Sequence, residues 1–75
     1  MSYIEIDFNK VKGFNNLSEP AKALFERVYK CHNAGQGMDY KEAWKPIKVK
    51  EHKQYLEVHF KNGDWLHYLP DGTWY

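Results

Sequence analysis

The chain has few of the residues that would point to a disulfide scaffold, a membrane span or a strongly basic binding domain. Its single cysteine, Cys31, cannot form an internal disulfide. No apolar run approaches the roughly 20 residues that a membrane-spanning helix needs. The net charge is +1 and Arg27 is the one arginine, so repeated bidentate recognition of phosphates is excluded. With no signal peptide at its start, the chain is predicted to be cytoplasmic and to have no membrane partner.

Motifs for catalysis and metal binding are also missing. The sequence has no Cys-x-x-Cys, no His-x-x-x-His and no Gly-x-Ser-x-Gly elbow. Cys31 and His32 are adjacent on a predicted helix, about 100° apart, which does not suit a shared set of metal ligands. We therefore expect no enzyme activity, no cofactor and no metal, and we interpret Cys31 as a small buried hydrophobe.

What the chain does have is apolar and aromatic residues. Of the 75 residues, 43% are hydrophobic and 17% are aromatic, against 28% that are charged. This composition predicts a folded chain, in which large rings supply much of the buried area. The length predicts that residues 1–75 form a single domain.

Helix signals are strongest after Ser18. This serine is followed by Glu19 and Pro20, residue types that are favoured in the first turn of a helix. Apolar residues then recur at three- and four-residue spacing: Ala21, Leu24, Phe25, Val28 and Cys31. The pattern predicts an amphipathic helix over residues 19–32.

Two shorter segments are less regular. Asp39, with a glutamate three residues later, resembles a capping box and predicts a short helix over residues 40–45. Residues 3–7 alternate between apolar and polar and fit an N-terminal strand. Asp7 would instead serve as the N-cap of a helical turn that ends at Gly13, and both alternatives stay open.

The last third of the chain predicts an antiparallel β-meander. Asn62-Gly63 and Asp71-Gly72 are typical of two-residue hairpin loops in which both residues have positive φ. Alternating apolar runs flank both dipeptides. We expect an α+β fold in which the helices cover one face of three or four strands, over residues 47–51, 54–61, 64–70 and 73–75.

Two-residue loops also divide the strand residues between two faces of the sheet, because opposed residues share a face. A third tight loop at His52-Lys53 would pair Val49 with Leu56, but its residues are poor turn formers and its length stays open. The face toward the helix is expected to carry Ile47, Val49, Leu56, Val58, Phe60, Trp65, His67, Leu69 and Trp74. The other face is expected to carry Lys48, Lys50, Tyr55, Glu57, His59, Leu66, Tyr68 and Tyr75. His59 and His67 then lie on opposite faces, and His67 is interpreted as a partly buried imidazole in the core.

The hairpin from Leu56 to Gly63, followed by Trp65-Leu66-His67-Tyr68, is similar to the hairpin of many small β modules, the KTSC-type domains among them. The similarity is confined to this hairpin and carries no functional residue, so no family is assigned. Compact, aromatic chains without a chemical motif are typical of small bacterial or phage proteins.

The predicted outer residues mix tyrosines with charged groups, as protein interfaces do. We therefore predict a small, non-catalytic binding or regulatory protein that contacts a protein partner through that face. One alternative is weak binding of single-stranded nucleic acid by Lys48, Lys50 and Lys53 with Tyr55 and Tyr68. Another is a homodimer that pairs its sheet edges or its tyrosine faces.

Overall fold

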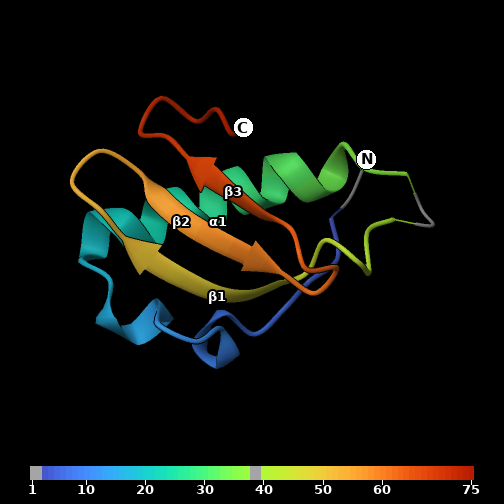
Figure 1. Ribbon diagram of the computed structural model, residues 1–75, viewed down its shortest axis with the longest axis horizontal. Helices are drawn as coiled ribbons and strands as arrows, with labels where there is room; N and C mark the ends of the chain where they lie inside the picture. The colour runs from blue at the N-terminus through green and yellow to red at the C-terminus, as the bar shows by residue number, and fades with distance from the viewer. Residues whose placement is uncertain (1–2, 38–39) are drawn as a thin grey trace.

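An α-helix and two 3-10 turns pack on one face of a three-stranded antiparallel sheet in the computed structural model, which describes residues 3–37 and 40–75 (Figure 1). The elements follow one another as η1 (Phe8–Lys10), η2 (Phe14–Asn16), α1 (Glu19–Ala34), β1 (Pro46–Glu51), β2 (Leu56–Phe60) and β3 (Trp65–Tyr68). The sheet order is β1-β2-β3, so the predicted α+β fold with a β-meander is confirmed. Within the described ranges, no helix is long and apolar enough to cross a membrane.

Helix α1 begins where the sequence predicts. The Ser18 side chain caps it, because Oγ accepts a hydrogen bond from the backbone N–H of Ala21 at 3.3 Å. The helix ends at Ala34, slightly beyond the predicted boundary at residue 32.

The buried side of α1 differs from the predicted stripe. Tyr29 and His32 are buried, whereas Cys31 is exposed, so the interpretation of Cys31 as a core residue is wrong. The physical reason is that both polar side chains find partners inside the protein. The Tyr29 hydroxyl donates to the carbonyl of Ile4 at 2.6 Å, and His32 hydrogen-bonds to another tyrosine of the core.

The N-terminal segment forms a helical turn and not a strand. Asp7 is the N-cap of η1, and its Oδ1 accepts a hydrogen bond from Asn9 N at 3.0 Å. The chain then reaches the edge of β1, where Lys12 N donates to the Ile47 carbonyl at 3.1 Å and the Lys12 carbonyl accepts from Val49 N at 2.8 Å. The strand predicted over residues 3–7 is therefore wrong, and the cap at Asp7 is confirmed. The turn ends at Lys10 and not at Gly13, which instead precedes η2.

The predicted short helix is a turn. Trp44 N donates to the Tyr40 carbonyl at 3.2 Å, but the next bond runs from Lys45 N to the Glu42 carbonyl at 3.3 Å, so no helical run develops. The expected N-cap, Asp39, lies outside the described residues. Packing holds the turn instead, since the ring of Trp44 lies 5.0 Å from that of Phe60.

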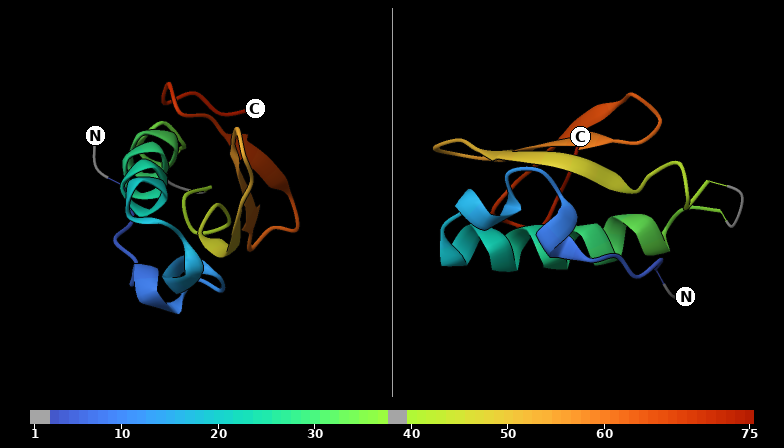
Figure 2. Two further views of the ribbon diagram at one scale, coloured as in Figure 1. Left: turned by 90° about the vertical axis from the view of Figure 1, so that its left-hand side faces the viewer. Right: turned by 90° about the horizontal axis from the view of Figure 1, so that it is seen from below.

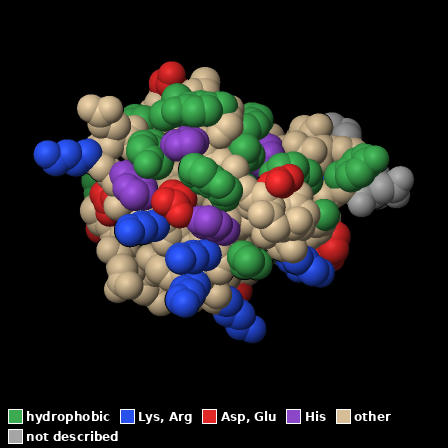
Figure 3. Space-filling model, viewed as in Figure 1, with side chains coloured by type: hydrophobic (Ala, Val, Ile, Leu, Met, Phe, Trp, Pro, Cys, Tyr) green, Lys and Arg blue, Asp and Glu red, His purple; other side chains and the backbone are tan. Residues whose placement is uncertain are grey.

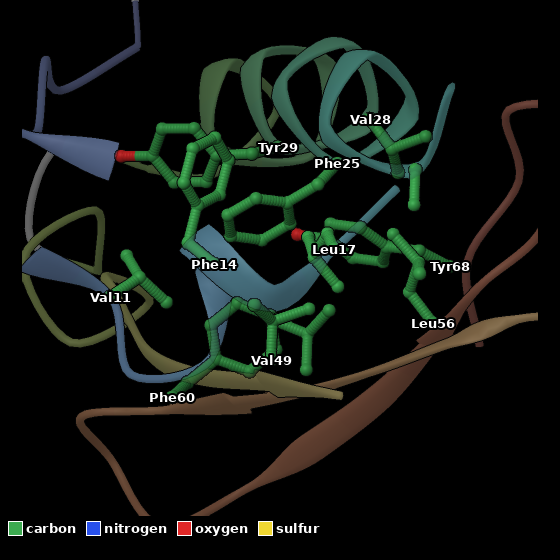
Figure 4. Packing of buried hydrophobic residues seen from close by; sticks show 12 residues of the cluster. Val11, Phe14, Leu17, Phe25, Val28, Tyr29, Val49, Leu56, Phe60 and Tyr68 are labelled. Carbon is green, nitrogen blue, oxygen red and sulfur yellow. The ribbon is translucent and has the colours of Figure 1, made fainter. Parts of the chain in front are cut away.

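The core lies between α1 and the sheet, which form two layers with η1 and η2 along one side (Figure 2). Aromatic rings from the N-terminal turns, the helix and the strands meet there (Figure 4). The buried hydrophobic residues are Val11, Phe14, Leu17, Ala21, Phe25, Val28, Tyr29, Val49, Leu56, Val58, Phe60 and Tyr68.

The loop between β1 and β2, whose length the sequence left open, is longer than a tight turn at His52-Lys53. Val49 pairs with Val58 and not with Leu56, so the register is shifted by two residues and Val49 keeps its place in the core. Residues 52–55 form the loop. Ile47 falls at an irregularity in the register and is 53% exposed, so its predicted burial is wrong.

The loop between β2 and β3 has three residues in place of two. The predicted two-residue turn needs a positive φ at both Asn62 and Gly63. Gly63 has a φ of 92°, but no non-glycine residue of the described chain, Asn62 included, has a positive φ. Phe60 N donates to the Asp64 carbonyl at 2.9 Å, and Gly63 N donates to the Phe60 carbonyl at 3.0 Å. This pattern is typical of a type I turn followed by a left-handed glycine.

A shift of one residue moves every side chain of β3 to the opposite face. Trp65 now opposes His59, and His67 opposes Glu57, on the side of the sheet away from α1. Leu66 packs against the core, and Tyr68 is fully buried. The predicted places of Trp65, Leu66, His67 and Tyr68 are therefore wrong.

The loop after β3 introduces a second shift of one residue, which cancels the first. Leu69 N donates to the Thr73 carbonyl at 2.8 Å across another three-residue loop, and Gly72 has a φ of 92°. Trp74 therefore pairs with Tyr68 on the helix side. Tyr75 lies beside the outward residues of β3, as predicted.

Candidate binding face

Two rows of side chains cross the sheet on the side away from α1. Each row begins with lysine, in β1 or in the segment beside it, and ends with a large aromatic ring beyond β2. The first row is Lys12, Lys48, His59 and Trp65, and the second is Lys50, Glu57, His67 and Tyr75. Together with His52 and Tyr55 of the β1–β2 loop, these residues are named the outer face. Figure 3 views this side, where imidazoles surround an acidic side chain and cationic side chains gather along one margin.

A carboxylate shared by two imidazoles lies at the centre of the outer face. Glu57 Oε2 lies 2.6 Å from His59 Nε2, and Oε1 lies 2.9 Å from His52 Nε2. Because an ionised carboxylate only accepts hydrogen bonds, each Nε2 is the donor. The hydrogen bond from His59, followed by that from His52, lowers the pKa of Glu57 below its ordinary value. Glu57 therefore stays ionised and holds both rings in place.

Aromatic rings continue from this centre toward the C-terminus. His67 stacks on Tyr75 with 4.6 Å between ring centroids and 11° between planes. On its other side His67 lies 4.5 Å from Tyr55, which itself stacks on His52 at 4.6 Å. Rings stacked in this way cover one another's flat faces. One flat face of each stacked ring is therefore withdrawn from solvent, and ring edges, hydroxyl groups and the outer faces of the end rings remain accessible.

Large side chains at the end of each row remain open to solvent. Trp65 is 49% exposed and Tyr75 is 64% exposed. Trp65 also contacts His67, with 4.9 Å between ring centroids, so it belongs to the same cluster. Exposed rings that gather in one place are characteristic of binding surfaces.

A groove borders the outer face at the β1–β2 loop. It has a volume of about 430 Å³ and lies between α1 and the loop, with Leu24, Arg27 and Pro70 on one side and His52 and Tyr55 on the other. Its size is in the range that holds a large side chain or a small ligand.

Most of the site residues expected from the sequence are brought together on the outer face. They are Lys48, Lys50, Tyr55, Glu57, His59 and Tyr75. Leu66 and Tyr68 are the two exceptions, because the β2–β3 loop turns them toward α1.

Sequence reasoning missed Lys12, His52, Trp65 and His67. A signal existed for one of the two loops, since a proline before Asp-Gly, as in Pro70-Asp71-Gly72, favours a type I turn. No proline precedes Asn62-Gly63, so the residues around this loop did not show which side chains of β3 face the core.

Among residues 3–37 and 40–75, no group of three or more histidine, cysteine or acidic side chains is placed to hold a metal ion. Comparison with protein families, curated proteins and solved structures gives no match. The geometry of the outer face is therefore the feature that points to a function.

Proposed function

We propose that this chain is a non-catalytic binding protein that contacts a protein partner through the outer face. The observation that carries the proposal is the ring cluster around His67, which lies on the solvent side of a sheet whose other side already forms the core. Tyrosine and tryptophan are enriched at protein interfaces, where an apolar ring and a polar tip are both used.

The way the rings are arranged favours a protein over single-stranded nucleic acid. Bases bind by stacking on flat ring faces, but His67 and Tyr75 already cover one face of each other, as do His52 and Tyr55, which leaves fewer faces for a base. Tyr68, one of the rings expected to stack on a base, is buried. Ring edges with hydroxyl and N–H groups suit the side chains and backbone of a protein instead.

The groove beside His52 and Tyr55 also supports this proposal. Interfaces draw most of their binding energy from a few side chains that enter pockets on the partner. A groove of about 430 Å³ next to the exposed rings offers one such pocket.

The test compares capture of partner protein from native cell lysate by the wild type and by Tyr75→Ser and Trp65→Ser. The control is Tyr40→Ser, because Tyr40 and Tyr75 are both 64% exposed but Tyr40 lies in the turn after α1, outside the outer face. We expect the wild type and Tyr40→Ser to capture the same protein and the two outer-face variants to lose at least about tenfold of it. Circular dichroism confirms that each variant is folded.

Two results would overturn the proposal. Equal capture by all four proteins would mean that the outer face is not the contact surface. Loss of the captured material after nuclease treatment would mean that nucleic acid is the partner.

A further inference from the structure

We infer that the partner segment on the outer face is an acidic, extended piece of protein whose carboxylates lie against β1. This inference rests on the proposed function and adds the chemistry of the partner. It depends on the lysines at the start of each row and on how the nearby acidic groups are used.

The lysines of β1 and its neighbours are unpaired, unlike others in the chain. Three other lysines form ion pairs with glutamates. The distance from Nζ to the nearest glutamate oxygen is 3.3 Å for Lys22, 3.1 Å for Lys45 and 3.5 Å for Lys61. In contrast, five exposed lysines have no ion pair or hydrogen bond through the side chain within the described part of the chain: Lys10 of η1, and Lys12, Lys48, Lys50 and Lys53 along β1 and the segments beside it. Their charges are available to a partner.

Acidic groups close to these lysines are already occupied. Both oxygens of Glu51 bind Ser18, one at 3.0 Å from its backbone N and the other at 2.9 Å from its hydroxyl. Both oxygens of Glu57 bind imidazoles. These hydrogen bonds keep both carboxylates ionised, but Lys12, Lys48, Lys50 and Lys53 outnumber the two glutamates. The β1 side of the outer face therefore has an excess of positive charge, although the whole chain has a net charge of only +1.

The spacing of the lysines matches an extended segment. Lys48 and Lys50 are two residues apart on one strand, so their side chains leave the sheet on the same face about 7 Å apart. An extended partner segment presents alternate side chains at the same interval. Lys12 widens this cationic margin, because it pairs with Lys48 across the edge of β1.

A second groove gives room for such a segment. It has a volume of about 520 Å³ and lies between η2 and β1, where its lining includes Lys12, Lys48 and Lys50 together with a single carboxylate, that of Glu51. Trp65 and Tyr75, at the far ends of the rows, are placed for apolar residues of the same partner. Charge at one margin and rings at the other therefore set the orientation of the partner.

The experiment uses a synthetic peptide in which glutamate alternates with valine. The peptide is titrated into the ¹⁵N-labelled full chain at low salt, and backbone amide shifts are followed by NMR. We expect saturable shifts at Lys48, Lys50 and Lys12 and a binding constant that weakens as salt is added. The same peptide with glutamine in place of glutamate is expected to bind at least about tenfold more weakly.

Charge-reversal variants provide the matched control. Lys48→Glu/Lys50→Glu is expected to weaken peptide binding at least about tenfold. Lys22→Glu/Lys45→Glu changes the net charge by the same amount at lysines outside the outer face, and it is expected to leave binding within about twofold. Thermal unfolding confirms that both variants are folded.

Several outcomes would overturn the inference. They are equal binding of the glutamine peptide, an equal loss from both double variants, and tighter binding of an oligothymidylate of the same charge. Shifts at the lysines that grow with protein concentration in the absence of peptide would instead assign the face to a second copy. If Tyr75→Ser still abolishes capture of the partner in any of these cases, the proposed function stands and only the acidic chemistry fails.

Discussion

Individual polar residues inside the core explain why the buried side of α1 was misjudged. His32 is only 2% exposed, and its Nδ1 lies 3.2 Å from the Tyr68 hydroxyl. Asn33, also buried, accepts a hydrogen bond from Ile4 N at 2.7 Å and donates to the Lys41 carbonyl at 3.1 Å. The burial of His32 and Asn33 cannot be predicted from residue type alone, because their hydrogen-bond partners come from other segments of the chain.

Burial of His32 leads to a prediction about pH. Loss of hydration lowers the pKa of His32 from 6.5 to about 4. Because the unfolded chain takes up a proton on His32 at a higher pH than the folded chain does, stability falls as the pH drops from 6.5 to 4. The loss amounts to roughly 3 kcal/mol in the free energy of unfolding. Urea unfolding at a series of pH values measures it.

His32→Phe is the control for this pH dependence, since it removes the titrating group and keeps an aromatic ring. The variant is expected to be less stable at pH 7, because the Tyr68 hydroxyl loses its partner, but to lose less stability between pH 6.5 and 4. Identical pH dependence in both proteins would mean that His32 does not titrate as its burial requires.

At the scale of elements, helices and strands were easier to predict than the faces they present. The start of α1 was readable because Ser18 and Pro20 act locally, and the strands were readable from alternation. The faces of β3 were not, because Asn62-Gly63 is compatible with loops of two or three residues. That difference of one residue decides whether His67 points to the core or to solvent.

A glycine beside β1 provides a second prediction. Gly13 has a φ of 89°, and a Cβ there would collide with the backbone carbonyl oxygen of Val49. Gly63 has a similar φ of 92° but has open space around its Cβ position. We expect Gly63→Ala to cost about 1–2 kcal/mol from backbone strain alone and Gly13→Ala to cost clearly more. Urea unfolding of both variants measures the difference, and equal costs would contradict the close approach.

At the scale of the whole molecule, the segments around Lys12 and Tyr75 lie along the two edges of the sheet. Lys12 bridges to the outer edge of β1, and Tyr75 exchanges two backbone hydrogen bonds with His67, at 2.9 and 3.2 Å. Both edges are thus partly occupied, which supports contact through the outer face over pairing of edges between two copies. The same pairings place Lys12 and Tyr75 at opposite margins of that face.

The claim on which this account depends is that His67 points to solvent while Tyr68 points to α1. Nuclear Overhauser effects between ring protons of the full chain in solution test it directly. The account predicts contacts from His67 to Tyr55 and Tyr75, whose ring centroids lie 4.5 and 4.6 Å away, and from Tyr68 to Phe25. Contacts from the His67 ring to Phe25 would contradict it, because they require the other register and remove the outer face as described.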